Sequence, residues 1–238
     1  MKNKLRYMGG EEFIRTIFSG ERDLSRIFLY QLAYLKDIPC FLHPVGCNLE
    51  EHPYFSGFQA YLEEQEEDFK TNPIRLENST LTRLIASGLH IPFTKGRGVN
   101  FTKANLSQAN LTRAEFRDSR FSNTNLTHAF LREVDFTNAS LSNALCINTD
   151  LSYAKFRNAD LTNTNFEDAT LIGADFRGAN LDGTNFNSAK LAKVDIRGAK
   201  NLEQALNLNL DPRLEIRADK TELYILSKIQ AVTDYTYF

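Results

Sequence analysis

Residues 104–121 read ANLSQANLTRAEFRDSRF, and the same five-residue pattern runs without a slip through residues 99–198. A bulky apolar residue recurs at every fifth position, and a small or β-branched residue precedes it by two positions. The positions between them are mostly Asn, Asp, Thr, Ser, Arg and Gly. Self-similarity at a fixed period is typical of a solenoid, in which successive repeats stack on one another.

The period also predicts the shape of one coil. Five residues match neither the 3.6-residue period of a helix nor the two-residue period of a strand, but they fit a chain that turns a corner on every repeat. If the coil has four sides, residues twenty apart stack and should be of one type. One such column holds only Leu, and the next holds Phe with one Ile: Leu111, Leu131, Leu151, Leu171, Leu191, then Phe116, Phe136, Phe156, Phe176, Ile196. The sequence therefore predicts an all-β solenoid, a quadrilateral β-helix of five coils.

Three segments, Ala104-Asn105-Leu106, Ala159-Asp160-Leu161 and Ala174-Asp175-Phe176, resemble the repeated motif of the pentapeptide-repeat family. The resemblance covers residues 99–198 and implies a right-handed quadrilateral β-helix filled by Leu and Phe; the handedness comes from the family, not from the spacing. The start of the chain is similar to cyanobacterial members in which a short helix caps the first coil. The family is functionally diverse, so the fold does not name the activity.

Three segments are expected along the chain. Residues 1–98 form an N-terminal cap, with a helix over 11–19, degenerate coils and an inserted loop and helix. Residues 99–200 form the β-helix. Residues 201–238 form a C-terminal capping segment with a helix over 218–233, because an exposed coil edge would template aggregation.

The boundary at residue 99 depends on two small residues. Leu76, Leu81 and Ile91 are in phase with the later repeats, but Ala86 and Gly96 do not fill the central position. We therefore interpret residues 33–98 as an insertion or irregular cap that contains a degenerate coil.

The composition and motifs indicate a non-enzymatic, cytoplasmic protein without cofactors. No run of eighteen apolar residues and no apolar leader are present, so we expect no membrane contact. Few cysteines suggest a reducing compartment, and no catalytic or phosphate-binding motif appears. Cys40, His43, Cys47 and His52 have the donor types for zinc, but their spacing matches no known zinc pattern, so no metal site is predicted.

Three functions remain open. The first is a scaffold that presents its faces to a regulatory protein, as some cyanobacterial relatives do. The second is a DNA mimic that binds a type II topoisomerase, as quinolone-resistance members of the family do. Mimicry requires a dense negative face, whereas residues 99–198 hold eleven acidic and eleven basic residues. The third is a structural spacer. We favour the scaffold, and we also consider a homodimer formed through the C-terminal helix.

One candidate surface is a column of arginines on the outside of the Phe face, formed by Arg117, Arg157, Arg177 and Arg197. Acidic residues stand two positions away. The favoured interpretation is a self-neutralising ladder, which adds little stability per exposed pair. The other is a stripe that receives an acidic partner.

The second candidate surface consists of apolar residues at outward positions, which are otherwise polar. They are Phe130, Leu145, Ile147 and Ile172, with Tyr153 at a corner. We expect them to cluster around one edge near the middle of the rod, with Cys146 buried beneath. An exposed apolar patch usually marks an interface. Either residues 33–98 cover it, or it docks a partner or a second copy of the chain.

Overall fold

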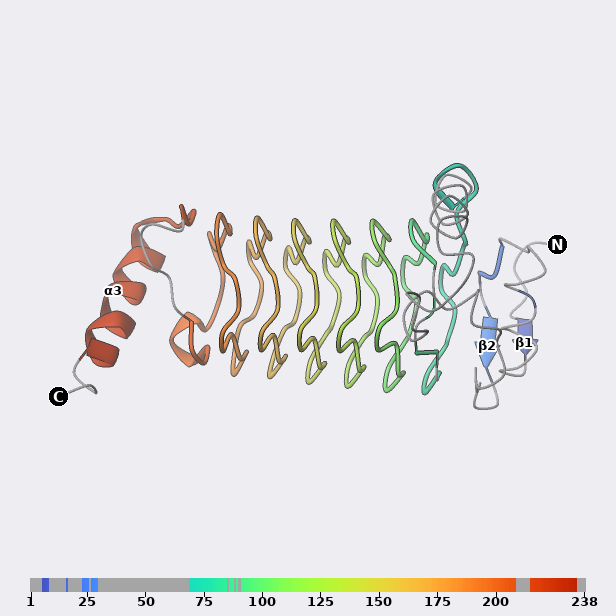
Figure 1. Ribbon diagram of the computed structural model, residues 1–238, viewed down its shortest axis with the longest axis horizontal. Coiled ribbons are helices and arrows are strands. Elements are labelled where there is room, and N and C mark those ends of the chain that lie inside the picture. Colours follow the sequence, from blue (N-terminus) through green and yellow to red (C-terminus); the bar gives the residue numbers. More distant parts are fainter. Residues whose placement is uncertain are drawn as a thin grey trace, which may run out of the picture.

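The computed structural model describes residues 6–8, 16, 23–25, 27–29, 69–84, 86–87, 89, 91–208 and 215–234. Stacked coils form a rod, with α3 (Lys220–Asp234) at one end and the parallel pair β1 (Arg6–Met8) and β2 (Ile27–Leu29) at the other (Figure 1). Within these residues no helix has the length and apolar character needed to cross a membrane.

The coil register confirms the four-sided prediction. Every parallel bridge from Arg75↔Lys95 to Asn180↔Lys200 joins residues twenty apart. We call the bulky apolar residue at every fifth position the central residue of its repeat. At each corner the second residue after it adopts a left-handed conformation, with φ of 53–61° for the non-glycine residues between Phe93 and Lys193. Because Asn, Asp and Gly tolerate this conformation best, the corner position explains the abundance of these residues in the repeats.

The core is a stack of Leu and Phe side chains inside the coil. All ten residues of the two predicted columns are buried, none exposing more than 3% of its surface. The Phe136 and Phe156 rings stack with centroids 5.7 Å apart, and Phe156 stacks on Phe176 at 5.1 Å. Cys146 is buried among them as predicted, and burial raises the pKa of its thiol to about 12. The interior is therefore filled by the chain itself.

The predicted boundary at residue 99 is wrong, because regular coils begin at Arg75. Leu76, Leu81 and Ile91 are fully buried, and Arg75 pairs with Lys95 as later residues pair with theirs. The prediction was wrong at Gly96, which it took as a break in the repeat. A Cβ atom at this position would lie 2.5 Å from the Phe116 ring, so the next coil already fills the space that the repeat residue would occupy.

The spacing between bridged residues indicates the insertion predicted inside residues 33–98. Asp23 pairs with Arg75, fifty-two residues later, where twenty is the rule in the rod. The Ser79 hydroxyl donates to the Leu24 carbonyl at 2.7 Å, which fixes this junction. The predicted helix over 11–19 lies outside the described residues except for Thr16, as do Cys40, His43, Cys47 and His52.

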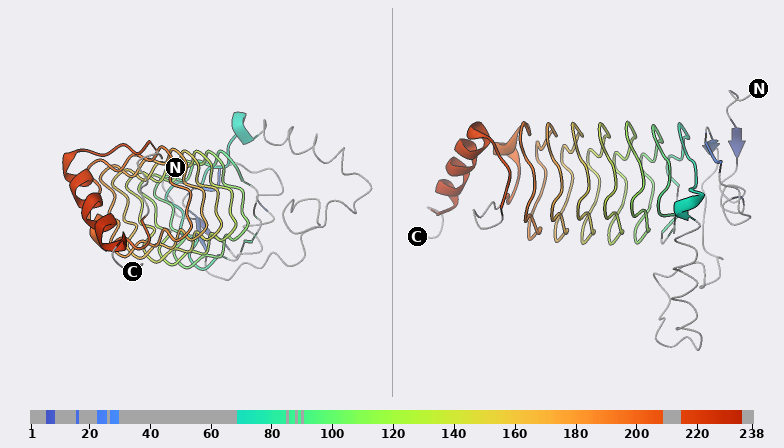
Figure 2. Two further views of the ribbon diagram at one scale, coloured as in Figure 1. Left: turned by 60° about the vertical axis from the view of Figure 1, so that its left-hand side comes forward. Right: turned by 90° about the horizontal axis from the view of Figure 1, so that it is seen from above.

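The C-terminal end continues from the coil into α3. The short 3-10 helix η3 (Leu202–Gln204) follows Lys200, which forms the last twenty-residue bridge, and Leu206 and Arg217 then pair with Asn185 and Asp195. The buried Glu222 carboxylate accepts bonds from the backbone N–H groups of Gly198 at 2.8 Å and Asp219 at 2.7 Å. These bonds tie α3 across the end of the rod (Figure 2). Next to the buried Glu222, Leu223 is 55% exposed.

Candidate functional site

The residue just before each central apolar residue has a structural task. All twelve Asn and Asp residues at this position, from Asn100 to Asp195, accept a hydrogen bond from the backbone N–H two residues later, at 3.0–3.3 Å. Such bonds close an Asx-turn. They explain why the position is polar: its side chain holds the backbone two residues later in place.

Phe130 and Leu145 occupy this Asx position and carry no acceptor. They are 44% and 43% exposed, so neither gains a buried contact in exchange. Leu145 lies between Asn125 and Asn165 in its column, and Phe130 is followed by Asp150 in its own. Both residues therefore give up a turn bond that the polar residues around them make.

Phe130, Leu145 and Ile147 lie around one corner of the rod, and we call them the apolar edge. Leu145 and Ile147 flank the buried Cys146 on one face, and Phe130 begins the next face one coil earlier. Ile147 is half-buried. The backbone places the three on two adjoining faces, in neighbouring coils.

Ile172 does not belong to this edge, so the prediction that it clusters with the other three is wrong; Tyr153 lies at the far corner, as expected. They lie at the far margin of the second face, where the Tyr153 N–H donates to the Ile172 carbonyl at 2.8 Å. The Tyr153 ring lies against Gly173 of the next coil and under the Arg132 guanidinium, 5.1 Å from it. Packing on the chain itself thus accounts for Tyr153.

Acidic side chains border the apolar edge. Asp150 stacks directly on Phe130, and Glu167 and Asp168 follow Ile147 and Asn148 one coil later. In the described part of the chain these three carboxylates form no ion pair with Lys or Arg. We call Asp150, Glu167 and Asp168 the acidic rim. This rim could not be predicted from the equal numbers of acidic and basic residues in the rod, because that balance averages over all four corners.

The comparisons identify the repeats. Residues 97–132, 131–168 and 164–200 match the family model described as Pentapeptide repeats, with 8 copies. This part of the chain belongs to the pentapeptide-repeat family. No curated protein matches the sequence.

Several solved pentapeptide-repeat structures are similar at low identity. Full-length QnrB1, a plasmid-mediated fluoroquinolone resistance protein, is 21% identical, covering 66% of this chain and 89% of QnrB1 with a TM-score of 0.32. Rfr23 from the cyanobacterium Cyanothece 51142 is 20% identical, covering 66% and 99%, with a TM-score of 0.25. HetL from Nostoc sp. strain PCC 7120, involved in heterocyst differentiation regulation, is 19% identical, covering 84% and 94%, with a TM-score of 0.19. The fold assignment rests on the register and the family match.

In the pentapeptide-repeat domain the arginine column is paired with carboxylates of its own chain. Arg117 contacts Asp135 at 2.8 Å, Arg177 contacts Asp175 at 2.8 Å, and Arg197 contacts Asp195 at 2.6 Å. Arg157 also pairs with Asp175. This pairing fits the self-neutralising ladder and leaves no guanidinium of the four without a carboxylate partner.

The ladder makes stability depend on pH. Burial alone would raise the pKa of Asp175, but hydrogen bonds from Arg177 and Arg157 outweigh it and lower the pKa from 3.8 to about 2. A carboxyl whose pKa is lower in the folded chain stabilises above its unfolded pKa, and this stabilisation is lost as the pH falls through the folded value. The free energy of unfolding should therefore fall between about pH 4 and pH 2.

Urea unfolding over this pH range measures the effect. Asp175→Asn is the control, because Asn keeps the Asx-turn acceptor and removes the titrating group. The variant should show a flatter pH dependence than the natural chain. An identical dependence in both proteins would contradict the assignment to Asp175.

Proposed function

We propose that this protein is a non-enzymatic interaction scaffold of the cytoplasm, whose right-handed β-helix presents the apolar edge to a protein partner. The observation that supports this choice is the pair of apolar residues at Asx positions. Residues that break a local structural rule without a compensating contact tend to mark functional sites. Phe130 and Leu145 do so at one corner, and every other residue at this position within residues 99–198 is polar.

The surroundings of the edge indicate the chemistry of the partner. The apolar edge offers hydrophobic contact, and the acidic rim offers unpaired negative charge beside it. A complementary segment would therefore carry apolar side chains flanked by Lys or Arg. Charge complementarity of this kind gives specificity and a faster encounter, while the apolar contact supplies most of the binding energy.

Site-specific photo-crosslinking tests the proposal. A photoreactive amino acid replaces Ile147 in the full chain, and the control replaces Asp182, which holds the equivalent position on another face. In extracts of the native host we expect one protein to be captured at position 147 and not at position 182. Capture at both positions, or at neither, would contradict an edge-specific partner. Inhibition of gyrase supercoiling by the purified chain would instead favour DNA mimicry.

Charge variants test the predicted chemistry of the captured partner. Asp150→Asn keeps the Asx-turn acceptor but removes one charge from the acidic rim, and it should weaken binding more strongly at low salt than at high salt. Asp160→Asn is the matched control, since Asp160 makes the same turn bond on another face. If both variants bind the captured partner with equal affinity, the acidic rim takes no part in binding.

A homodimer through α3 is a separate proposal about assembly. Leu223 is 55% exposed and Tyr224 is 63% exposed on this helix. If they form a dimer interface, Leu223→Asp converts a dimer into a monomer in light scattering and leaves crosslinking at position 147 unchanged. An unchanged mass would exclude this interface.

A further inference from the structure

Arg120 is one of two arginines in the coils described between residues 75 and 208 that form no ion pair with Asp or Glu; the other is Arg83. Within residues 91–208, every other arginine forms an ion pair with Asp or Glu, whereas Arg120 has no carboxylate partner. Its side chain is exposed, and it occupies an Asx position, where it cannot accept the turn bond. An exposed guanidinium with its donors unused is a ready binding group for an oxyanion.

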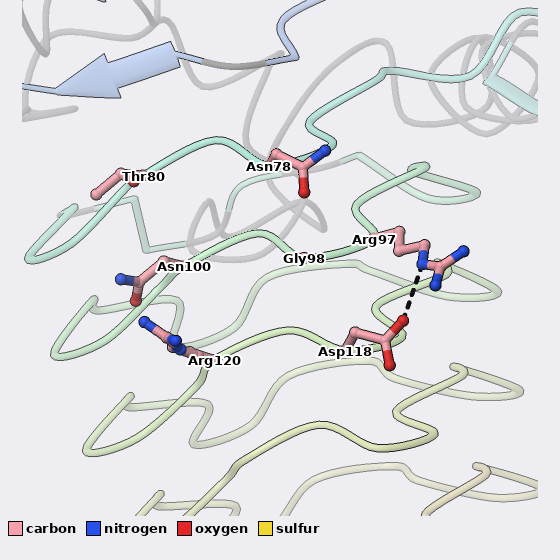
Figure 3. A pocket seen from close by; sticks show the side chains of 7 residues that line it. All are labelled: Asn78, Thr80, Arg97, Gly98, Asn100, Asp118 and Arg120. Atoms are coloured by element: carbon pink, nitrogen blue, oxygen red, sulfur yellow. Dashed lines mark hydrogen bonds and ion pairs between the residues drawn. The ribbon is translucent and has the colours of Figure 1, made fainter. Parts of the chain in front are cut away.

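Arg120 lines a hollow of about 520 Å³ at a corner near the N-terminal end of the rod. Figure 3 shows Arg97 and Asp118 on one side of it and Thr80, Asn100 and Arg120 on the other. This corner is diagonally opposite the corner of the apolar edge, ten positions away in the twenty-residue coil. The hollow is therefore independent of the proposed docking surface.

The hollow lies beside Gly98, and the Asn78 side chain reaches over this glycine. Gly98 lies between Asn78 and Asp118 in one corner column, with φ of +70°, and a Cβ atom there would lie 2.6 Å from the Asn78 side-chain oxygen. At the corner positions of other columns Asn, Asp and longer side chains adopt the same conformation. A side chain at position 98 would therefore have to displace Asn78, which lines the hollow.

The polar groups of the hollow favour an anion. The Arg97 Nε donates to Asp118 at 2.8 Å, and the other Asp118 oxygen accepts from Asn138 at 3.0 Å, so this carboxylate is already satisfied. The Asn100 oxygen accepts from the Thr102 N–H at 3.0 Å, which leaves its amide N–H₂ as a donor. Two guanidinium groups and one carboxylate give the lining a net positive charge.

We propose that this hollow binds the carboxylate or phosphate group of a small molecule, held by the Arg120 guanidinium and the Asn100 amide. The volume is that of a small-molecule site rather than a macromolecular groove. Arg120 forms two parallel hydrogen bonds to the oxyanion, the geometry for which a guanidinium is suited.

Titration of the full chain with inorganic phosphate, and separately with acetate, tests the site. Binding is followed by NMR shifts of the Gly98 amide and the Arg120 Nε–H. We expect saturable shifts with at least one probe, and the responding probe defines the ligand group. No saturable shift with either probe would overturn the proposal.

Two variants and two matched controls distinguish binding in the hollow from a non-specific effect of surface charge. Arg120→Gln should weaken binding by about tenfold or more, because it removes a charged hydrogen bond. Gly98→Asn should also weaken binding, because a Cβ atom at position 98 displaces the Asn78 side chain that lines the hollow. Gly178→Asn is the control for Gly98, since Gly178 has the same φ of +70° in the same column. Lys190→Gln is the charge control. Equal weakening by the controls would overturn the site.

Discussion

Phe156→Ala is expected to lower the free energy of unfolding by about 3–5 kcal/mol. Phe156 is fully buried and lies between Phe136 and Phe176, with ring centroids 5.7 and 5.1 Å away. Removing the ring leaves a cavity in the middle of the stack, and the coil cannot close over it because hydrogen bonds to the coils on both sides hold its backbone. Denaturant unfolding measures this loss of free energy. The dependence of the free energy of unfolding on denaturant concentration should be the same in both proteins.

Phe130→Ala is the matched control for this prediction. The same ring is deleted, but Phe130 is 44% exposed and points outward. Its substitution should change the free energy of unfolding by about 0.5 kcal/mol or less. If both variants lose the same stability, the assignment of inward and outward positions is wrong.

Gly96→Leu should destabilise the protein although it restores the repeat pattern. Inserting a side chain into a packed core costs about 1–3 kcal/mol, and the Cβ atom alone would approach the Phe116 ring to 2.5 Å. The double variant Gly96→Leu with Phe116→Ala should recover part of the loss, because the smaller residue vacates the space. Thermal unfolding of the four proteins in the cycle gives the coupling between the sites.

If the stability changes of the two single substitutions simply add in the double variant, the packing of Gly96 against Phe116 is contradicted. In that case Gly96 would tolerate or reject Leu for a reason unrelated to Phe116. A stabilising Gly96→Leu would show that the first coils are less tightly stacked than the structure indicates.

The repeat explains why so much of the fold could be predicted. Each side of the coil sees the same environment, so the column Leu111 to Leu191 repeats one residue type and reveals the coil length. The start of the coils could not be found this way. Gly96 is acceptable only because Phe116 from the next coil fills its space, and that contact joins residues twenty apart.

The candidate surface was only partly predictable. Phe130, Leu145 and Ile147 were found because apolar residues at outward positions contradict the pattern. Their separation from Tyr153 and Ile172 depends on which margin of a face each residue occupies. The free guanidinium of Arg120 was missed for a similar reason: Arg117 pairs with Asp135, eighteen residues away, and such a pair depends on side-chain reach rather than on the column.

The most direct test of the apolar edge is to measure stability and binding together in Leu145→Asn. Asn should restore the Asx-turn bond and raise the free energy of unfolding by about 0.5–1.5 kcal/mol. The affinity for the protein captured at position 147 should fall about tenfold or more, because a buried Leu contributes about 1.5–3 kcal/mol at an interface.

Leu206→Asn is the control for this measurement. Leu206 is 54% exposed and pairs with Asn185 at the end of the same column, so it presents a similar side chain away from the edge. Binding by Leu206→Asn should match that of the natural chain. We predict that Leu145→Asn gains stability and loses affinity; unchanged affinity in Leu145→Asn would contradict the proposal that the apolar edge is the binding surface.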